Sequence, residues 1–111
     1  MNSVLSSLGL IRKAGRLTYG SDAAVDAIRS GKATVVVVAC DASENTKKRL
    51  TDKAKTYGVR YEEIPFTRAE LGQAIGKENC ACTAICGDDF AGLFDGAKNK
   101  NPEVNKCQKK N

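Results

Sequence analysis

Residues 34–40 of the chain read TVVVVAC, a β-branched and almost continuously apolar run. A strand exposed on one face would alternate apolar and polar residues, whereas a strand covered on both faces is apolar throughout. The run therefore predicts a central strand with helices packed on both sides of its sheet. The whole chain has 111 residues, which is the size of one domain built around such a strand.

Upstream of the central strand, an amphipathic helix is predicted over residues 3–14. Val4, Leu8 and Ile11 recur there at spacings of four and three, which places them on one face of a helix. A short extended segment, residues 17–19, follows this helix. The first helix is therefore expected to cover the sheet with its apolar face.

A second helix is predicted over residues 21–30, between two glycines. Ser21 is expected to be its N-cap, because a serine hydroxyl can accept a hydrogen bond from an N–H group of the first turn. Gly31 is expected to end the helix, since glycine adopts the left-handed conformation common just after a helix.

Downstream of the central strand, helices and strands alternate with short turns between them. In order, these are a helix over residues 44–57 capped by Ser43, an exposed strand over 59–64, a helix to residue 75 begun by a Thr67–Glu70 capping box, an apolar strand over 80–86, and a short helix marked by Phe90, Leu93 and Phe94. This alternation predicts an α/β fold, a three-layer α-β-α sandwich with a small mixed, partly parallel sheet. We assign residues 1–95 to one α/β domain and expect the lysine-rich residues 96–111 to form a flexible tail.

The composition indicates a basic protein with a polyanionic partner. The net charge is +5 and the sequence pI is near 9.0, and neutralising phosphates releases condensed counterions. The chain has no histidine, which removes the commonest general base and the commonest metal ligand. We find no nucleophile–base pair and no nucleotide-binding motif, so we expect no enzymatic activity, no metal and no cofactor.

Three features of the sequence predict a cytoplasmic protein. No run of about 18 apolar residues could cross a membrane. The basic residues near the N-terminus follow the apolar ones, which is the reverse of a secretory signal. The five cysteines are an odd number and cannot all pair with one another, so free thiols in a reducing compartment are expected.

The cysteines at positions 80, 82 and 86 fall on one face of the predicted strand over residues 80–86, because alternate residues of a strand share a face. A zinc knuckle uses C-x-x-C pairs on turns, and this chain has no histidine that could complete such a set of ligands. Buried cysteine behaves as a small apolar residue. We therefore interpret these cysteines as core residues.

The turn at Gly20 is the most informative candidate site. A glycine before a helix start leaves backbone N–H groups, at the positive end of the helix dipole, free to bind a phosphate or a base edge. Arg12, Lys13 and Arg16 lie just before the turn, and Lys32 lies after it. If these residues converge, they surround the helix start with positive charge. The alternative is a plain tight turn with scattered surface charge, and the residues alone leave both open.

Two long stretches, residues 8–50 and 68–94, resemble the kink-turn-binding ribosomal protein family typified by archaeal L7Ae, and its small bacterial YlxQ-like branch most of all. The shared features are the glycine-capped helix at Gly20, the span to Gly31, GKA leading into the valine strand, and ELGQAIGK before the last strand. The resemblance implies an α-β-α sandwich that grips kink-turns, in which tandem sheared G·A pairs bend an RNA duplex sharply.

The resemblance also implies a base-reading signature, Gly-x-Asn-Glu-x-x-Lys, at the start of the second helix. Gly20 matches the glycine. Asp22, Ala23 and Asp26 stand in place of the asparagine, glutamate and lysine. Asp22 can accept hydrogen bonds from a guanine edge but cannot donate one, and Asp26 would repel a phosphate. The polar loop that begins at Lys77 replaces the apolar residues with which other members pack on an extruded nucleotide.

We therefore expect a ribosome-associated or RNA-associated protein that binds structured RNA of the kink-turn kind. Its partner is expected to be structured RNA, ribosomal RNA included, rather than DNA or a membrane. The predicted site residues are Lys13, Arg16, Gly20, Ser21, Asp22, Lys32 and Lys77. The alternative is a protein-interaction or assembly module of the same fold without specific RNA binding, and Ala23 and Asp26 are the features that favour it.

Overall fold

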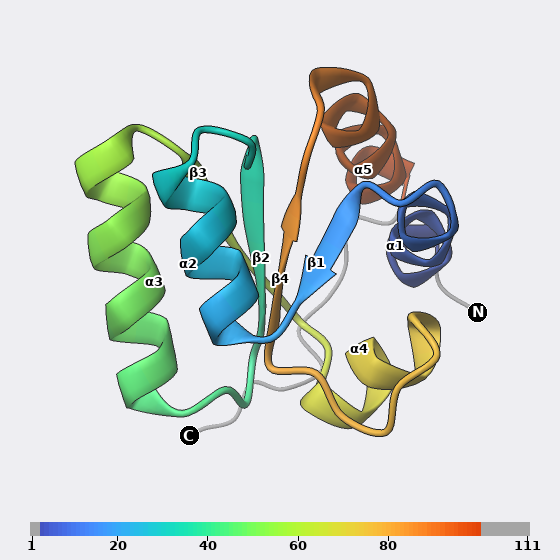
Figure 1. The fold of residues 1–111 in the computed structure, drawn as a ribbon. Helices are drawn as coiled ribbons and strands as arrows, with labels where there is room; N and C mark the ends of the chain where they lie inside the picture. Colours follow the sequence, from blue (N-terminus) through green and yellow to red (C-terminus); the bar gives the residue numbers. More distant parts are fainter. Residues whose placement is uncertain (1–2, 101–111) are drawn as a thin grey trace.

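The computed structural model describes residues 3–100, and these residues form the expected three layers of helix, sheet and helix (Figure 1). The elements follow in the order α1 (Ser3–Lys13), β1 (Leu17–Tyr19), α2 (Ser21–Arg29), β2 (Val35–Ala39), α3 (Glu44–Tyr57), β3 (Arg60–Ile64), α4 (Arg68–Ala74), β4 (Cys82–Ile85) and α5 (Asp88–Lys100). None of the helices in this described part of the chain is long and apolar enough to span a membrane.

The four strands form one mixed sheet in the order β1-β4-β2-β3. β2 pairs in parallel with β3 and antiparallel with β4, and β1 pairs antiparallel with β4 at the edge. One parallel pair in an otherwise antiparallel sheet confirms the predicted mixed, partly parallel arrangement. The central position predicted for residues 34–40 is also confirmed, because β2 has a partner strand on each side.

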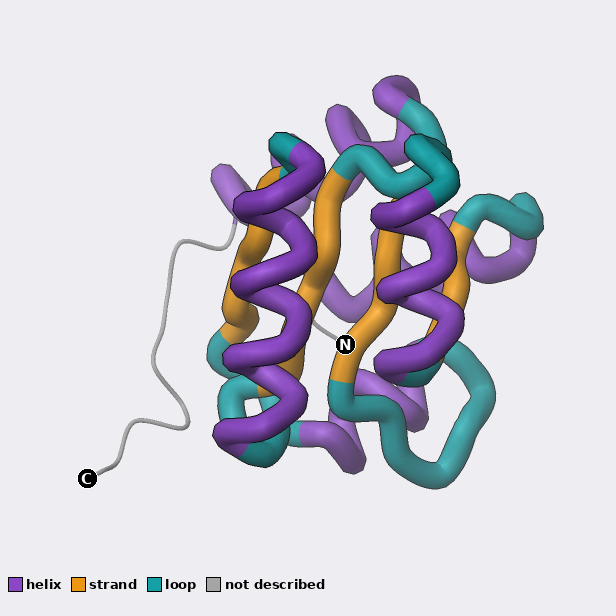
Figure 2. Tube along the Cα trace, turned by 60° about the vertical axis from the view of Figure 1, so that its left-hand side comes forward, coloured by secondary structure: helices purple, strands orange, loops and turns teal. Residues whose placement is uncertain are grey.

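The valine run of β2 supplies both apolar cores. Val35 and Val37 face the cluster covered by α1, α4 and α5, whereas Val36 and Val38 face the cluster covered by α2 and α3. All four valines are completely buried. Figures 1 and 2 show α2 and α3 side by side on one face of the sheet, with the remaining helices behind it. A strand placed between two helical layers has no exposed face, which explains why its sequence does not alternate.

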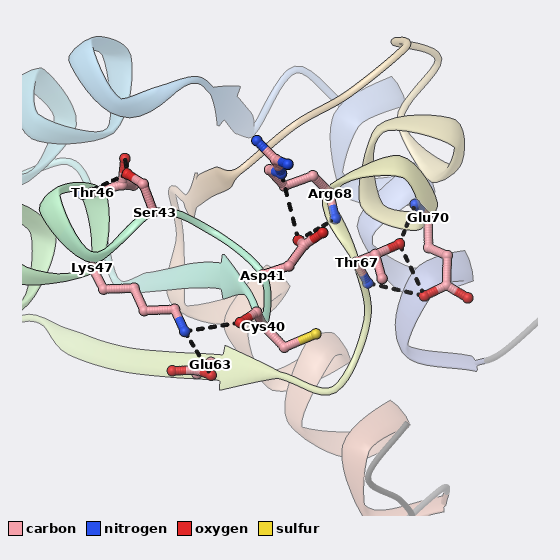
Figure 3. Close-up of polar contacts among 9 residues, drawn as sticks. All are labelled: Cys40, Asp41, Ser43, Thr46, Lys47, Glu63, Thr67, Arg68 and Glu70. Carbon is pink, nitrogen blue, oxygen red and sulfur yellow. Dashed lines mark hydrogen bonds and ion pairs between the residues drawn. The ribbon is translucent and has the colours of Figure 1, made fainter. Parts of the chain in front are cut away.

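The predicted caps of α3 and α4 are confirmed (Figure 3). The Ser43 hydroxyl accepts a hydrogen bond from the first turn of α3. Thr67 and Glu70 form a reciprocal capping box at the start of α4. The Arg68 N–H donates to Asp41 Oδ1 at 2.7 Å, so the start of α4 is also tied to the loop that follows β2.

The predicted N-cap of α2 is wrong. Ser21 is the first residue of the helix, and the N-cap is Gly20, for which no side-chain capping bond exists. Gly20 has φ 91° and ψ 152°, a conformation that is essentially restricted to glycine. The backbone geometry of Gly20, rather than a serine hydroxyl, therefore sets the start of this helix.

The last helix is longer than the sequence predicted. Ala91, Phe94 and Ala97 are all buried and recur every three residues, so the apolar stripe continues beyond Phe94 into a segment of polar composition. The predicted domain end at residue 95 consequently falls inside α5, which continues to Lys100. Residues 101–111 lie outside the described part of the chain, and for them the flexible tail stays a prediction.

The cysteines at positions 80, 82 and 86 do not share one face of a strand, so this part of the prediction is wrong. β4 is shorter than predicted, and Cys80 lies before it in the core under α1, α4 and α5. Cys82 lies in the opposite core, and Cys86 packs against the edge of that core. The core interpretation is confirmed for Cys80 and Cys82, which are buried free thiols. Cys86, which is half-buried, is also a free thiol, as expected.

Candidate nucleic-acid interface

The corner at Gly20 is fixed by two backbone hydrogen bonds. Its N–H donates to the Cys82 carbonyl at 3.0 Å, and its carbonyl accepts from the Ala24 N–H at 3.0 Å. The corner is thereby attached to the first residue of β4 and to the first turn of α2. The N–H groups of Ser21 and of the next two residues have no carbonyl one turn earlier in the helix to bind, so they are directed outward at the positive end of its dipole.

Arg49 reaches this corner from α3. Its Nη2 lies 3.1 Å from Asp22 Oδ1, and its Nη1 donates a long hydrogen bond of 3.4 Å to Ser21 Oγ. The Asp22 side chain is 93% exposed, so the carboxylate stands on the surface beside the open N–H groups. Arg49 is not among the predicted site residues, because nothing in the order of residues shows that α3 lies beside α2. The ion pair offsets part of the negative charge that Asp22 brings to the site.

Two further cations meet at Tyr19, the residue before the Gly20 corner. Lys77 Nζ lies 4.2 Å from the centre of the Tyr19 ring, and Arg12 Cζ lies 5.2 Å from it. The hydrogen bond and charge of Lys77 lower the pKa of the Tyr19 phenol, and Arg12 adds to this effect. A lowered phenol pKa reflects a positive potential. The sequence alone suggests no role for Tyr19, because its nearer cation, Lys77, comes from a loop remote in the chain.

The loop that carries Lys77 is anchored to α4. The Lys77 N–H donates to the Gly72 carbonyl at 2.7 Å, and the Cys80 N–H donates to the Arg68 carbonyl at 3.0 Å. At Gly72 an added Cβ would lie only 2.7–2.9 Å from the backbone of Asn79, so the loop can pack this closely only against glycine. The motif ELGQAIGK therefore has a structural role, which is to hold Lys77 in a fixed position beside Tyr19.

The structure separates the predicted site residues into two groups. Gly20, Ser21, Asp22 and Lys77 gather at one end of β1 and α2, as described above. Arg16 and Lys32 lie at the other end, where both act electrostatically on the Cys86 thiol, whose pKa is raised by burial. Nine residues of α2 span about 13 Å, so the two groups are well separated. Lys13 is exposed at the last residue of α1. Arg16 and Lys32 therefore do not converge on the Gly20 corner, and the predicted site residues form two separate basic ends.

An open groove of about 740 Å³ runs along the face of α2 that borders β1. Its lining consists of Thr18, Ala23, Asp26, Ala27, Arg29, Ser30, Lys32, Tyr57 and Cys86. Ala23 and Asp26, the two residues that depart most from the family signature, thus lie in the wall of this groove. In the part of the chain that the structure describes, no group of three or more His, Cys, Asp or Glu residues is arranged to hold a metal ion.

The chain belongs to the Ribosomal protein L7Ae/L30e/S12e/Gadd45 family, whose model matches residues 2–91. Within this family, it is similar to two proteins named RNA-binding protein YlxQ. It is 39% identical over 84 residues to the one from Bacillus subtilis, covering 76% of this chain and 83% of that protein. It is 45% identical over 73 residues to the one from Enterococcus faecium, covering 66% and 70%. These similarities confirm the resemblance to the YlxQ branch, and the family is one of ribosomal and RNA-binding proteins rather than enzymes.

Solved structures share the fold. A protein of unknown function from Bacillus halodurans has a TM-score of 0.78 and 33% identity, and the alignment covers 86% of this chain and 99% of that one. The 15.5 kD RNA-binding protein of Giardia lamblia has a TM-score of 0.72 at 20% identity, covering 88% and 83%. The second likeness is one of fold alone. Together they confirm the α-β-α sandwich.

Proposed function

We propose that this protein binds structured RNA of the kink-turn kind, as a ribosome-associated or RNA-associated protein. The observation that carries the proposal is the Gly20 corner, where the first N–H groups of α2 lie beside Arg49 of α3 and next to Tyr19, over which Lys77 of the α4–β4 loop is placed. Membership of a family of ribosomal proteins, and similarity to proteins named for RNA binding, supports RNA as the ligand. The net charge of +5 favours the same class of partner.

In the proposed complex, backbone groups contribute more than base-reading side chains. The N–H groups from Ser21 onward bind a phosphate or a base edge at the bend. Asp22 accepts hydrogen bonds from the edge of a guanine. Ala23 contributes no polar group, and the carboxylate of Asp26 repels phosphates. We therefore expect weaker binding than the complete family signature would give.

The second basic end extends the proposed interface along the RNA. Arg16 and Lys32 would contact phosphates of the duplex on the far side of the groove, and Lys13 would add charge from the end of α1. Each phosphate contact adds to the salt dependence, with a slope of roughly 0.9 per neutralised phosphate on a duplex. The slope of the logarithm of affinity against the logarithm of salt concentration should thus give the number of phosphate contacts that the two ends make.

The test is a titration with two labelled RNAs. One contains a kink-turn, and in the other the G·A pairs are replaced by Watson–Crick pairs. The proposal expects tighter binding to the first, with affinity that falls steeply as salt rises. Equal and weak binding to both RNAs would contradict the kink-turn part of the proposal and leave general RNA binding.

A second candidate function is a protein-interaction or assembly module. The presence of Ala23 and Asp26 in the groove favours it, because Ala23 lacks the acceptor of the glutamate it replaces and Asp26 puts a negative charge in place of a lysine donor. Failure to bind either RNA at low salt would favour this second candidate. The double variant Ala23→Glu, Asp26→Lys restores two of the three signature residues that this chain lacks, and it should strengthen kink-turn binding if the groove faces RNA.

A further inference from the structure

Tyr19 is an exposed aromatic residue held between cations. It is 44% exposed at the end of β1, and it is one of four large apolar residues exposed to this degree in the described part of the chain. Arg12 comes from the end of α1 and Lys77 from the loop between α4 and β4. An aromatic ring and two cations, one of them from a loop remote in the sequence, therefore lie directly beside the Gly20 corner.

The charge of this cluster is not neutralised by carboxylates. Several other cations of residues 3–100 form ion pairs, namely Lys47, Arg49, Arg60 and Arg68. Among these same residues, neither Arg12 nor Lys77 forms an ion pair. An aromatic face attracts a cation through its quadrupole but carries no net charge. Tyr19 therefore fixes the two cations in place while their full charge stays available to an anion.

Two further observations agree with an anion-binding role. Lys77 and Arg12 both lower the pKa of the Tyr19 phenol, so the potential at the ring is positive. Arg12 Nε is buried and has no hydrogen-bond acceptor within the described residues. Burying an unsatisfied donor costs free energy, so the position of Arg12 is not explained by the stability of its own hydrogen bonds.

We propose that Arg12, Tyr19 and Lys77 form a phosphate-binding cluster that holds the RNA backbone beside the start of α2. The inference rests on the proposed RNA-binding function and adds the group of the RNA that this end of the site contacts. Arg12 and Lys77 bind the phosphate, and Tyr19 is a positioning residue that keeps them together. The anchoring of the Lys77 loop to α4 reduces the entropy that the loop loses when RNA binds.

The test measures the affinity of each variant for the kink-turn RNA over a range of salt concentrations. Lys77→Gln and Arg12→Gln should each weaken binding and lower the salt slope by about 1, the value for one lost phosphate contact. Lys48→Gln is the matched control, because Lys48 is exposed on α3 and its substitution removes one positive charge, as the other two substitutions do. Tyr19→Leu should weaken binding and reduce the slope, whereas Tyr19→Phe keeps the ring and should bind like the parent protein.

The outcomes separate this inference from the proposed function. If the parent protein prefers the kink-turn RNA, but the Lys77, Arg12 and Tyr19 variants match the Lys48 control in affinity and slope, the cluster is not a phosphate site. If the parent shows no preference, the kink-turn function fails first, and a lower slope in the Lys77 variant would still support phosphate binding. No binding of the parent to either RNA at low salt would overturn both. Thermal melting checks the fold, and Lys77→Gln carries the test should Tyr19→Leu unfold.

Discussion

Arg49 of α3 and Asp22 of α2 form an ion pair at the start of α2, with Arg49 Nη2 3.1 Å from Asp22 Oδ1. The pair is exposed, since 45% and 93% of the two side chains are accessible. Exposed pairs contribute about 0.2–1 kcal/mol to stability, so holding the fold together is at most a small part of its role. The pair matters for its position, because Asp22 stands in the proposed RNA site, where the resemblance to kink-turn-binding proteins implies a base-reading asparagine.

Replacing the carboxylate by an amide tests that position. Asp22→Asn removes a negative charge that faces the RNA and supplies an N–H donor, so we expect kink-turn binding to tighten by on the order of tenfold. Asp52→Asn makes the same change of charge on the exposed surface of α3 and should alter binding little. The measurement is the dissociation constant at fixed salt. Unchanged or weaker binding of Asp22→Asn would show that Asp22 does not face the RNA.

The corner itself depends on a glycine. Gly20→Ala should lower the free energy of unfolding by about 1–3 kcal/mol, because φ 91° with ψ 152° is strained for any residue with a Cβ. It should also weaken RNA binding, since the first N–H groups of α2 would be redirected. Gly58→Asn is the control at another positive-φ site, because asparagine tolerates the left-handed conformation found there. Denaturant unfolding compares the two variants, and equal stability would contradict this account of the corner.

The packing of the Lys77 loop depends on a second glycine. Gly72→Ala should destabilise the protein by about 1–3 kcal/mol, because the added Cβ would lie 2.7–2.9 Å from the backbone of Asn79. Gly92→Ala on α5 is the matched control. Its Cβ would meet nothing within 4 Å, and alanine favours a helix more than glycine does by about 0.5–1 kcal/mol. If the urea midpoint of Gly72→Ala equalled that of the parent protein, the close contact between Gly72 and the backbone of Asn79 would be contradicted.

Cys82 should make stability depend on pH in the alkaline range. Burial raises the pKa of its thiol to about 12 from an ordinary value of 9.0. The unfolded chain therefore loses this proton above about pH 9 while the folded protein keeps it, so the free energy of unfolding should fall as pH rises from about 9 toward 12. Unfolding by denaturant at several pH values measures the slope. Cys82→Ala is the comparison, and a slope as steep as that of the parent would contradict the prediction.

Local patterns in the sequence predicted most of the elements, because their physical causes are local. The Ser43 cap and the Thr67–Glu70 capping box bind groups within one helical turn, and both were predicted from a few letters. The error at Ser21 has the same origin. A serine beside a glycine indicates a cap, but only the backbone torsion angles showed that Gly20 takes that place.

The end of α5 was missed because its apolar stripe depends on small residues. Ala91 and Ala97 are weak signals of burial in a polar segment, and their burial follows from packing against α1. The candidate site was predicted only in part for a similar reason. Sequence proximity suggested that Arg16 would adjoin Gly20. The two residues instead lie at opposite ends of β1, because Arg16 precedes this strand and Gly20 follows it.

The sequence by itself determined the central strand, because a run of valines without alternation is stable only between two apolar layers. It also determined that Gly20 begins the candidate site, since a glycine before a helix leaves N–H groups open. Only the tertiary structure decided which side chains surround that corner. Arg49 and Lys77 reach it from segments remote in the chain, and the energies of such contacts depend on distances in space that the order of residues does not contain.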